Sequence, residues 1–236
     1  MPKSTNLQQT LWDLQKRFGD HAITMLGARG TSAAAITTGF PQLDAALGAG
    51  GMPDHGLTEL VGVPTSGMTT LALRIIASAH ADAAPVVYLD GAGTFDPDYA
   101  ARCEVDPDRL LLVQPEDAAQ ALLIARDCAR TNSVRLIVLD LVGLPVRGSK
   151  PLEQLREALV RTRCAALLLH NEPVPTTLND LFQLQLRLAW TGWVTQGHDV
   201  SGYRVQVTVV KDKARAGERQ VVLELHPDRA VDGGAP

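Results

Sequence analysis

The chain has 236 residues, which is enough to bury a substantial core, and we expect one large α/β domain rather than two small ones. With 22 lysines and arginines against 26 aspartates and glutamates, its net charge is −4, which excludes a global positive field for nucleic acid or an anionic membrane. Its three scattered cysteines lack C-x-x-C spacing, so we expect free thiols, no zinc and no haem. No apolar run approaches the ~18 residues of a membrane span, so we expect a soluble cytoplasmic protein without membrane contact.

An amphipathic stretch opens the chain. Residues 6–18 place apolar side chains on one face of a predicted helix, with Asn6 as its cap and Gln9 completing a capping-box pattern. HAITML follows as a short strand and ARGTSAAA as a linker. We therefore predict a docking or polymerisation arm and linker over residues 1–35, while a helix folded back on its own core stays open as the alternative. The arm residues are Leu7, Leu11, Leu14, Phe18, Ile23 and Met25.

Alternating strands and helices fill the predicted core domain, residues 36–228. Strands are expected at 57–63, 84–90, 108–114, 134–140 and 164–170, and helices at 69–81, 96–104, 115–131 and 151–163. This alternation predicts a mostly parallel sheet with helices on both faces.

The last stretch of the core domain changes character. Residues 181–193, 203–211 and 219–226 alternate apolar and polar side chains, which predicts antiparallel edge strands with Gly202 and Gly217 in the turns. Residues 229–236 are expected to form a disordered tail.

The first strand and helix are joined by VGVPTSGMTT, which nearly matches the phosphate-binding loop G-x-x-x-x-G-K-[ST]. Backbone N–H groups and the helix terminus could still surround a phosphate, but Met68 stands where the loop needs a lysine. The alternative is a tight strand-to-helix turn without a ligand. The candidate nucleotide-binding residues of the loop are Gly62, Ser66, Gly67, Met68, Thr69 and Thr70.

Asp140 ends the apolar strand VRLIVLD, at the edge of a parallel sheet where ligand crevices form. An acid there is typical of the second Mg²⁺-linked group of phosphate sites, although strand ends also carry aspartate as a helix cap. ATP with Mg²⁺, held through Thr69 and Asp140, is therefore the only cofactor we consider, and only if nucleotide binds at all.

Several stretches together resemble the bacterial RecA recombinase family over roughly residues 7–228. They are LQKRFGDHAITMLG, ITTGFPQLDAALGAGGMPDHGLTELVGVPTSGMTT, VVYLDGAGTFDPDYA, LLLVQPEDAAQALLIA, VRLIVLD and VTVVKDKARA. The resemblance implies a RecA-like P-loop core that forms an ATP-dependent filament on single-stranded DNA and pairs homologous strands.

The resemblance also assigns individual residues. It implies that Asp96 and Tyr99 hold the adenine, and that Lys211 and Lys213 reach a neighbouring filament subunit across the ATP. It places Phe182 at the same subunit boundary, where the arm of one subunit also packs on the next.

Departures from the family pattern argue against hydrolysis. The catalytic glutamate that the family carries two residues after the aspartate of YLD is Ala92 here. Together with Met68, this leaves neither a water-activating group nor a clamp on the γ-phosphate. We therefore predict no catalytic residues and very slow or absent hydrolysis by this chain alone.

The two DNA-binding loops of the family are short in this chain. The first, LVGLPVRGSKP, has Arg147 and Lys150 as its only cations, and the second, NEPVPTTLND, is net negative. The glutamine that senses the γ-phosphate in the family corresponds to Glu172. Because a groove that follows a phosphate backbone needs several cations, we expect weak or indirect contact with single-stranded DNA.

The leading hypothesis is a non-hydrolysing RecA paralogue, an accessory or regulatory factor in DNA repair, recombination or damage-induced (SOS) mutagenesis. It would dock on RecA, on a second copy or on an error-prone polymerase complex, and so is similar to the RecA-like accessory proteins of error-prone polymerase cassettes. Two alternatives stay open: an ATPase or recombinase completed in trans by Lys211 and Lys213, and a structural subunit that binds no nucleotide.

Overall fold

The computed structural model describes residues 35–82, 84–196 and 199–226. The predicted arm, with Leu7, Leu11, Leu14, Phe18, Ile23 and Met25, and the predicted tail 229–236 lie outside the described residues.

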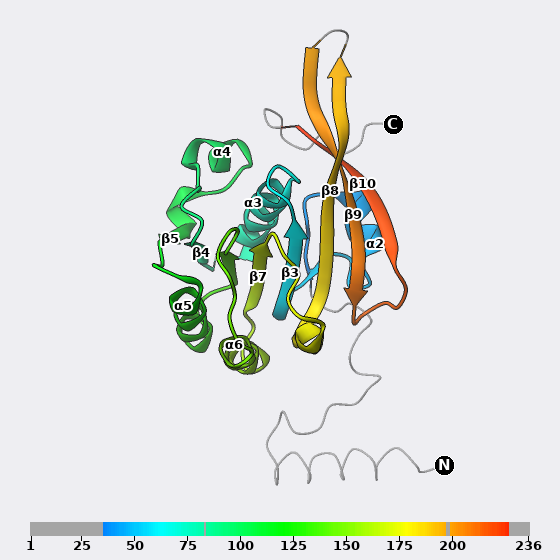
Figure 1. Cartoon of the computed structure of the whole chain (residues 1–236). Coiled ribbons are helices and arrows are strands. Elements are labelled where there is room, and N and C mark those ends of the chain that lie inside the picture. The colour runs from blue at the N-terminus through cyan, green and yellow to red at the C-terminus, as the bar shows by residue number, and fades with distance from the viewer. Residues whose placement is uncertain (1–34, 83, 197–198, 227–236) are drawn as a thin grey trace, which may run out of the picture. The chain divides into compact units, whose positions relative to one another are not determined.

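An eight-stranded mixed sheet forms the centre of the core domain, in the order β10-β9-β8-β3-β7-β6-β4-β5 (Figure 1). The pairs from β8 to β5 are all parallel, while β9 pairs antiparallel with both β8 and β10. The predicted mostly parallel sheet is confirmed. Its strands are β3 (Gly56–Gly62), β4 (Val86–Asp90), β5 (Leu110–Val113), β6 (Leu136–Asp140), β7 (Ala165–His170), β8 (Phe182–Gln196), β9 (Asp199–Asp212) and β10 (Arg219–Leu225).

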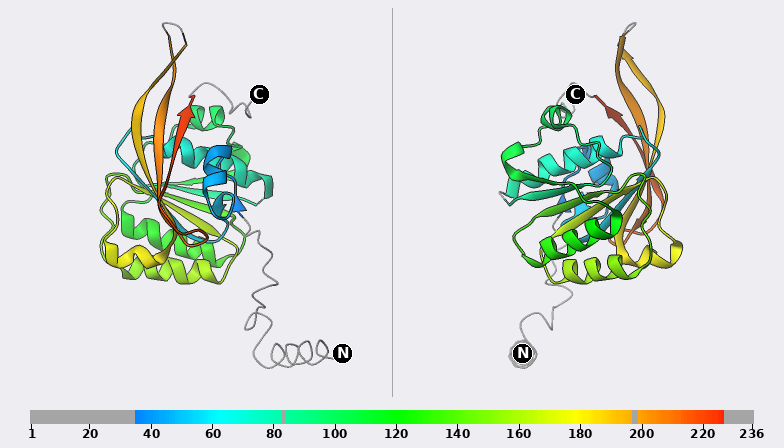
Figure 2. Two further views of the ribbon diagram at one scale, coloured as in Figure 1. Left: turned by 90° about the vertical axis from the view of Figure 1, so that its right-hand side faces the viewer. Right: turned by 60° about the vertical axis from the view of Figure 1, so that its left-hand side comes forward.

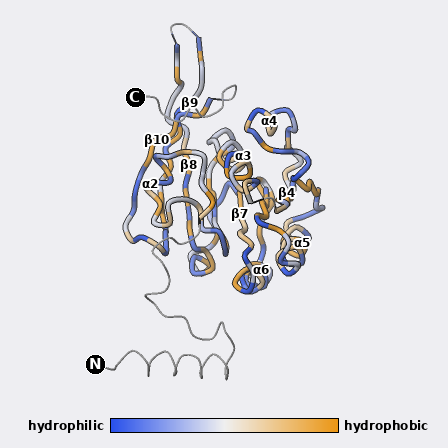
Figure 3. The backbone as a smooth tube through the Cα atoms, turned by 180° about the vertical axis from the view of Figure 1, so that it is seen from behind, coloured by the Kyte–Doolittle hydropathy of each residue, from blue (hydrophilic) through white to orange (hydrophobic). Residues whose placement is uncertain are grey.

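Helices cover both faces of this sheet, as predicted (Figure 2). The inner strands are apolar throughout because alternate side chains enter two separate cores: Tyr88 and Val138 pack on the α3 side, whereas Val87 lies on the α5–α6 side. Hydrophobic and hydrophilic residues alternate along α5 and α6 (Figure 3), as expected of helices with one face on a sheet. The α-helices are α2 (Pro41–Ala46), α3 (Met68–Ala79), α4 (Pro97–Arg102), α5 (Ala118–Arg130) and α6 (Lys150–Val160).

Short elements that the sequence pattern did not predict complete the fold. A two-stranded sheet pairs β1 (Ala35–Ile36) with β2 (Met52–Pro53), and α2 packs near β10. The 3-10 turns are η1 (His80–Asp82), η2 (Pro107–Arg109) and η3 (Thr176–Leu181). Among the described residues, no helix has the length and hydropathy that a membrane span requires.

Strands β8 and β9 run on beyond their neighbours as a two-stranded ribbon (Figures 1 and 2). β3 pairs with β8 only as far as Leu188, and β10 pairs with β9 only as far as Tyr203. The predicted turn at Gly202 is therefore wrong: Gly202 pairs with Val194 inside the ribbon, and glycine is needed there because a Cβ would collide with the carbonyl oxygen of Leu225. Of the two glycines predicted in turns, only Gly217 lies between strands, with φ +97°.

Candidate functional site

The loop between β3 and α3 has the tight geometry that its glycines indicate. Gly67 adopts φ +90° directly before α3, and a Cβ at this position would lie 2.6 Å from Leu225 Cδ1 and 3.0 Å from Val205 Cγ2. A Cβ on Gly62 would collide with Ser66 Oγ. Glycine is therefore required at both positions, by the neighbouring strands as well as by the turn.

This loop opens into a cavity of about 360 Å³. The topology brings segments that are far apart in sequence to one place, at the carboxyl ends of β3, β4 and β6. The lining residues are Val63, Pro64, Thr65, Ser66, Gly67, Met68, Thr69, Thr70, Ala92, Thr94, Asp140, Val142 and Tyr203.

The cavity lining carries almost no charge. Met68 is only 4% exposed and belongs to the apolar core on the α3 side, so its side chain is anchored in the protein. Ala92 lies on the same cavity without a carboxylate. Asp140 is the one carboxylic acid and no lysine or arginine occurs among the described residues that line the cavity, so no side chain of the lining offsets the negative charge of a triphosphate.

Asp140 is held in place by a hydrogen bond to each oxygen. The Tyr88 hydroxyl donates to Oδ2 at 2.8 Å, and the Val142 N–H donates to Oδ1 at 3.3 Å. Burial raises the pKa of the Asp140 carboxyl, while these two bonds oppose the shift. Burial, together with the charge of Asp140, raises the pKa of Tyr88 far above its usual range, so Tyr88 remains a neutral donor.

A cluster of three hydroxyl groups lies at the edge of the cavity, at the start of α3. Thr70 Oγ1 lies 2.6 Å from the Tyr99 hydroxyl and 2.9 Å from the Tyr203 hydroxyl. Burial raises the pKa of Tyr99, so Tyr99 takes part in this cluster as a neutral phenol near pH 7. Asp96 caps α4, since its Oδ1 accepts from the Asp98 N–H at 2.9 Å and the Tyr99 N–H at 3.1 Å.

Tyr203 is not among the site residues predicted from the sequence. It continues the buried alternation of Val205, Val207 and Val209 along β9, a signal that places it on the core face of the strand. Which part of the protein this face covers depends on the strand order, and the alternation alone does not give the strand order.

The structure places Lys211 and Lys213 away from the cavity. The Lys211 Nζ donates to the Asn179 carbonyl oxygen at 2.5 Å, and the Lys213 Nζ to the Asp180 carbonyl oxygen at 3.1 Å, so η3 holds both side chains. Burial, with Lys211 and Arg156 nearby, lowers the pKa of Lys213. Phe182 is 0% exposed and packs in the chain's own core on the α5–α6 side.

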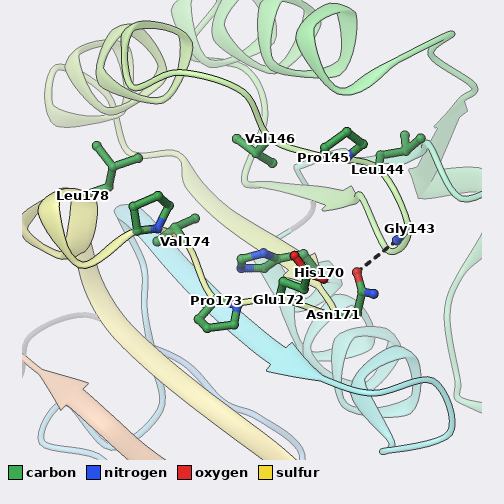
Figure 4. A pocket seen from close by; sticks show the side chains of 11 residues that line it. Gly143, Leu144, Pro145, Val146, His170, Asn171, Glu172, Pro173, Val174 and Leu178 are labelled. Atoms are coloured by element: carbon green, nitrogen blue, oxygen red, sulfur yellow. Dashed lines mark hydrogen bonds between the residues drawn. The ribbon is translucent and has the colours of Figure 1, made fainter.

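A second cavity, of about 410 Å³, lies between the loops that follow β6 and β7 (Figure 4). Asn171 Oδ1 bridges the two loops by accepting from the Gly143 N–H at 3.2 Å. The walls are mostly apolar and rich in proline, and Glu172 adds a negative charge. The lining residues are Gly143, Leu144, Pro145, Val146, His170, Asn171, Glu172, Pro173, Val174, Pro175 and Leu178.

A buried polar network that was not predicted from the sequence lies behind this second cavity. Glu59 Oε1 lies 2.7 Å from His170 Nε2 and accepts from the Val174 N–H at 3.2 Å. Glu59 Oε2 accepts from Gln185 Nε2 at 2.6 Å. The network ties β3 to β7, β8 and the loop after β7, all of them in the interior.

The residues of the first cavity fit part of what ATP with Mg²⁺ needs. Ser66 Oγ is buried without a partner among the described residues, and Thr69 and Asp140 offer the oxygen ligands that Mg²⁺ prefers. Met68 and Ala92 do not fit hydrolysis, because a P-loop site uses a lysine and a water-positioning group there. The described residues contain no group of three or more His, Cys, Asp or Glu side chains that could hold a metal by themselves.

Comparison with known proteins places this site in a family. The family model for the RecA N-terminal domain matches residues 5–155, which include the whole loop, Ala92 and Asp140. Protein RecA of Aquifex pyrophilus is 32% identical over 245 residues, covering 89% of this chain and 70% of the relative. Protein RecA of Chloroflexus aurantiacus is 31% identical over 264 residues, covering 97% and 75%, and that of Acinetobacter baylyi is 30% identical over 264 residues, covering 98% and 76%. The chain therefore belongs to the RecA family.

Proposed function

We propose that this chain is a non-hydrolysing RecA-family factor in DNA repair, recombination or damage-induced mutagenesis, acting by docking on a RecA-family protein through its N-terminal arm. One observation carries the proposal: the cavity at the phosphate loop holds Met68 and Ala92 where hydrolysis needs a cation and a water-positioning group. The cavity would then serve as a switch or interface that binds ATP with Mg²⁺ but does not turn it over.

The loops after β6 and β7 support the same proposal. The second cavity between them is lined by apolar residues and Glu172, and the described residues that line it include no lysine or arginine. A path for single-stranded DNA needs several cations and aromatic platforms. Docking on protein is therefore favoured over direct contact with DNA.

A hydrolysing enzyme completed in trans is the alternative to test. It requires Lys211 or Lys213 to leave its bond to η3 and reach the cavity of another copy. Removing a charge-assisted hydrogen bond costs roughly 1.5–3 kcal/mol, which assembly would have to offset.

The test is phosphate release by the purified full chain over a range of protein concentrations, with and without single-stranded DNA. The proposal expects no release above background at any concentration. Release that rises with concentration and falls in Lys211→Met would establish the alternative and refute the proposal. Docking is tested by co-sedimentation with RecA filaments, in which a Leu11→Asp/Phe18→Asp variant is expected to lose binding.

A further inference from the structure

The β8–β9 ribbon carries, near its base, two exposed tryptophans that touch each other. Trp190 is 46% exposed and Trp193 is 59% exposed, and their rings meet edge to face with centroids 5.7 Å apart. Neither residue lines the cavities described above. Such a pair is normally buried against other apolar groups, because aromatic side chains contribute a large apolar area.

A strand irregularity places both tryptophans on one face of the ribbon. Trp190 pairs with Val205 and Trp193 pairs with Tyr203, and these two partners are two residues apart on β9 and share a face. The register shifts between Trp190 and Gly192, so residues three apart on β8 come to the same side. The aromatic pair is therefore one continuous surface.

The outer edge of β8 is also open along this stretch. Beyond Leu188, the described residues provide no strand on the side of β8 away from β9, so the main chain of 189–196 faces outward unpaired. Edge strands in monomeric proteins are commonly protected by lysine or proline. Residues 189–196, AWTGWVTQ, contain neither and carry no charge.

The charges around the ribbon favour a protein partner over nucleic acid. Arg204 is paired with Glu224 at 2.9 Å, and Lys211 is bonded to η3. The described part of the ribbon thus leaves no cluster of cations beside the tryptophans that could follow a phosphate backbone.

We propose that the ribbon segment 189–196 is a self-association surface, in which the β8 edges of two copies pair antiparallel and the tryptophans of each copy pack on the other. A two-fold pairing places the same segment opposite itself, so a strand that is free of charge meets no like charge in any register. This contact is made by the ribbon, whereas the docking in the proposed function is made by the N-terminal arm.

The two tryptophans supply about half of the area that such a dimer needs. Taking about 250 Å² for a whole tryptophan, the exposed parts of Trp190 and Trp193 supply about 500 Å² over two copies. A specific interface needs about 1,000 Å² in total, so the paired strand edges and neighbouring Val and Thr side chains must supply the rest. The irregular register keeps the main-chain pairing short, which makes the tryptophans the main anchors.

Sedimentation velocity of the full chain over a range of concentrations tests the proposal. We expect a monomer–dimer equilibrium for the wild type. Trp193→Lys should weaken dimerisation by about 30-fold or more, because it removes a central aromatic anchor and places two ammonium groups in the contact. Val222→Lys is the matched control: Val222 is an exposed valine on β10, which β9 separates from the β8 edge, and its replacement should leave the equilibrium unchanged.

Two further variants make the result decisive. Trp190→Thr/Trp193→Thr removes the rings but keeps strand-forming residues, and it should also weaken dimerisation if the fold is intact by circular dichroism. Leu11→Asp/Phe18→Asp disrupts the arm and should leave ribbon dimerisation in place. A wild type that stays monomeric, tryptophan variants that dimerise like the wild type, or a dimer lost only in the arm variant would each overturn the proposal.

Discussion

The Tyr203 hydroxyl lies 2.9 Å from Thr70 Oγ1, although the two residues are 133 positions apart in the chain. Tyr203 belongs to β9 at the base of the ribbon, and Thr70 to the first turn of α3, directly after the phosphate loop. Tyr99 reaches the same oxygen from α4. One threonine thus joins three elements at the edge of the nucleotide cavity.

Replacing this threonine tests how much the cluster stabilises the fold. Thr70→Val keeps the shape of the side chain but removes the oxygen that both tyrosines contact. We expect the free energy of unfolding to fall by about 1–3 kcal/mol, since two partly buried hydroxyls lose a partner. Tyr99→Phe and Tyr203→Phe serve as controls with smaller expected losses of about 1 kcal/mol each. Urea unfolding measures all three, and a Thr70→Val protein as stable as the wild type would contradict this account.

A buried carboxylate gives the second prediction. Glu59→Ala leaves His170 and Gln185 without their common partner in the interior, and should lower the free energy of unfolding by about 3–5 kcal/mol. Glu172→Ala is the control at an exposed position nearby, with an expected change within about 0.5 kcal/mol. Equal effects of the two substitutions would show that the network around Glu59 contributes little.

A buried histidine predicts a pH dependence. Both ring nitrogens of His80 are buried without a partner among the described residues, and burial lowers the pKa of His80 below its usual 6.5. The unfolded chain therefore binds a proton at higher pH than the folded chain does. The part of the folding stability that depends on a neutral His80 is fully present above about pH 6.5. It is lost as the pH falls through 6.5 toward the folded-state pKa.

Removing that side chain should flatten the pH dependence. His80→Leu is expected to reduce the loss of unfolding free energy between about pH 7 and pH 5, and to raise stability by about 1–3 kcal/mol. Val222→Leu, at an exposed position without a titratable group, is the control and should leave the slope as in the wild type. Urea unfolding at several pH values measures both, and a slope that His80→Leu leaves unchanged would disprove the assignment.

Restoring the missing site groups gives a further prediction. Met68→Lys/Ala92→Glu should strengthen Mg-ATP binding, since a charge-assisted contact of about 1.5–3 kcal/mol is regained. DNA-stimulated turnover should stay low, because the loops after β6 and β7 remain short and poor in cations. Val63→Lys, which adds a charge at an exposed position of the same loop, is the control for non-specific attraction. Strong DNA-stimulated turnover in the double variant would overturn our interpretation of these loops.

The sequence predicted the sheet and its helices because buried parallel strands and amphipathic helices leave strong local patterns. Each of the three segments predicted as antiparallel edge strands forms a strand. The first of them, β8, pairs parallel with β3 on one side and antiparallel with β9 on the other, because the chain reverses direction only after β8. Gly202 was misplaced in a turn because glycine signals both turns and close backbone approach. Tyr203 and the partners of Glu59 depend on which strands are neighbours, which periodicity alone does not specify.

The most direct test of the central claim is a calorimetric titration of the full chain with Mg-ATP, followed by a phosphate assay on the same sample. Our account predicts heat of binding that Thr69→Val weakens, and no phosphate above background. Phosphate release by the unmodified chain would contradict it, because Met68 and Ala92 would then stand in a working hydrolytic site.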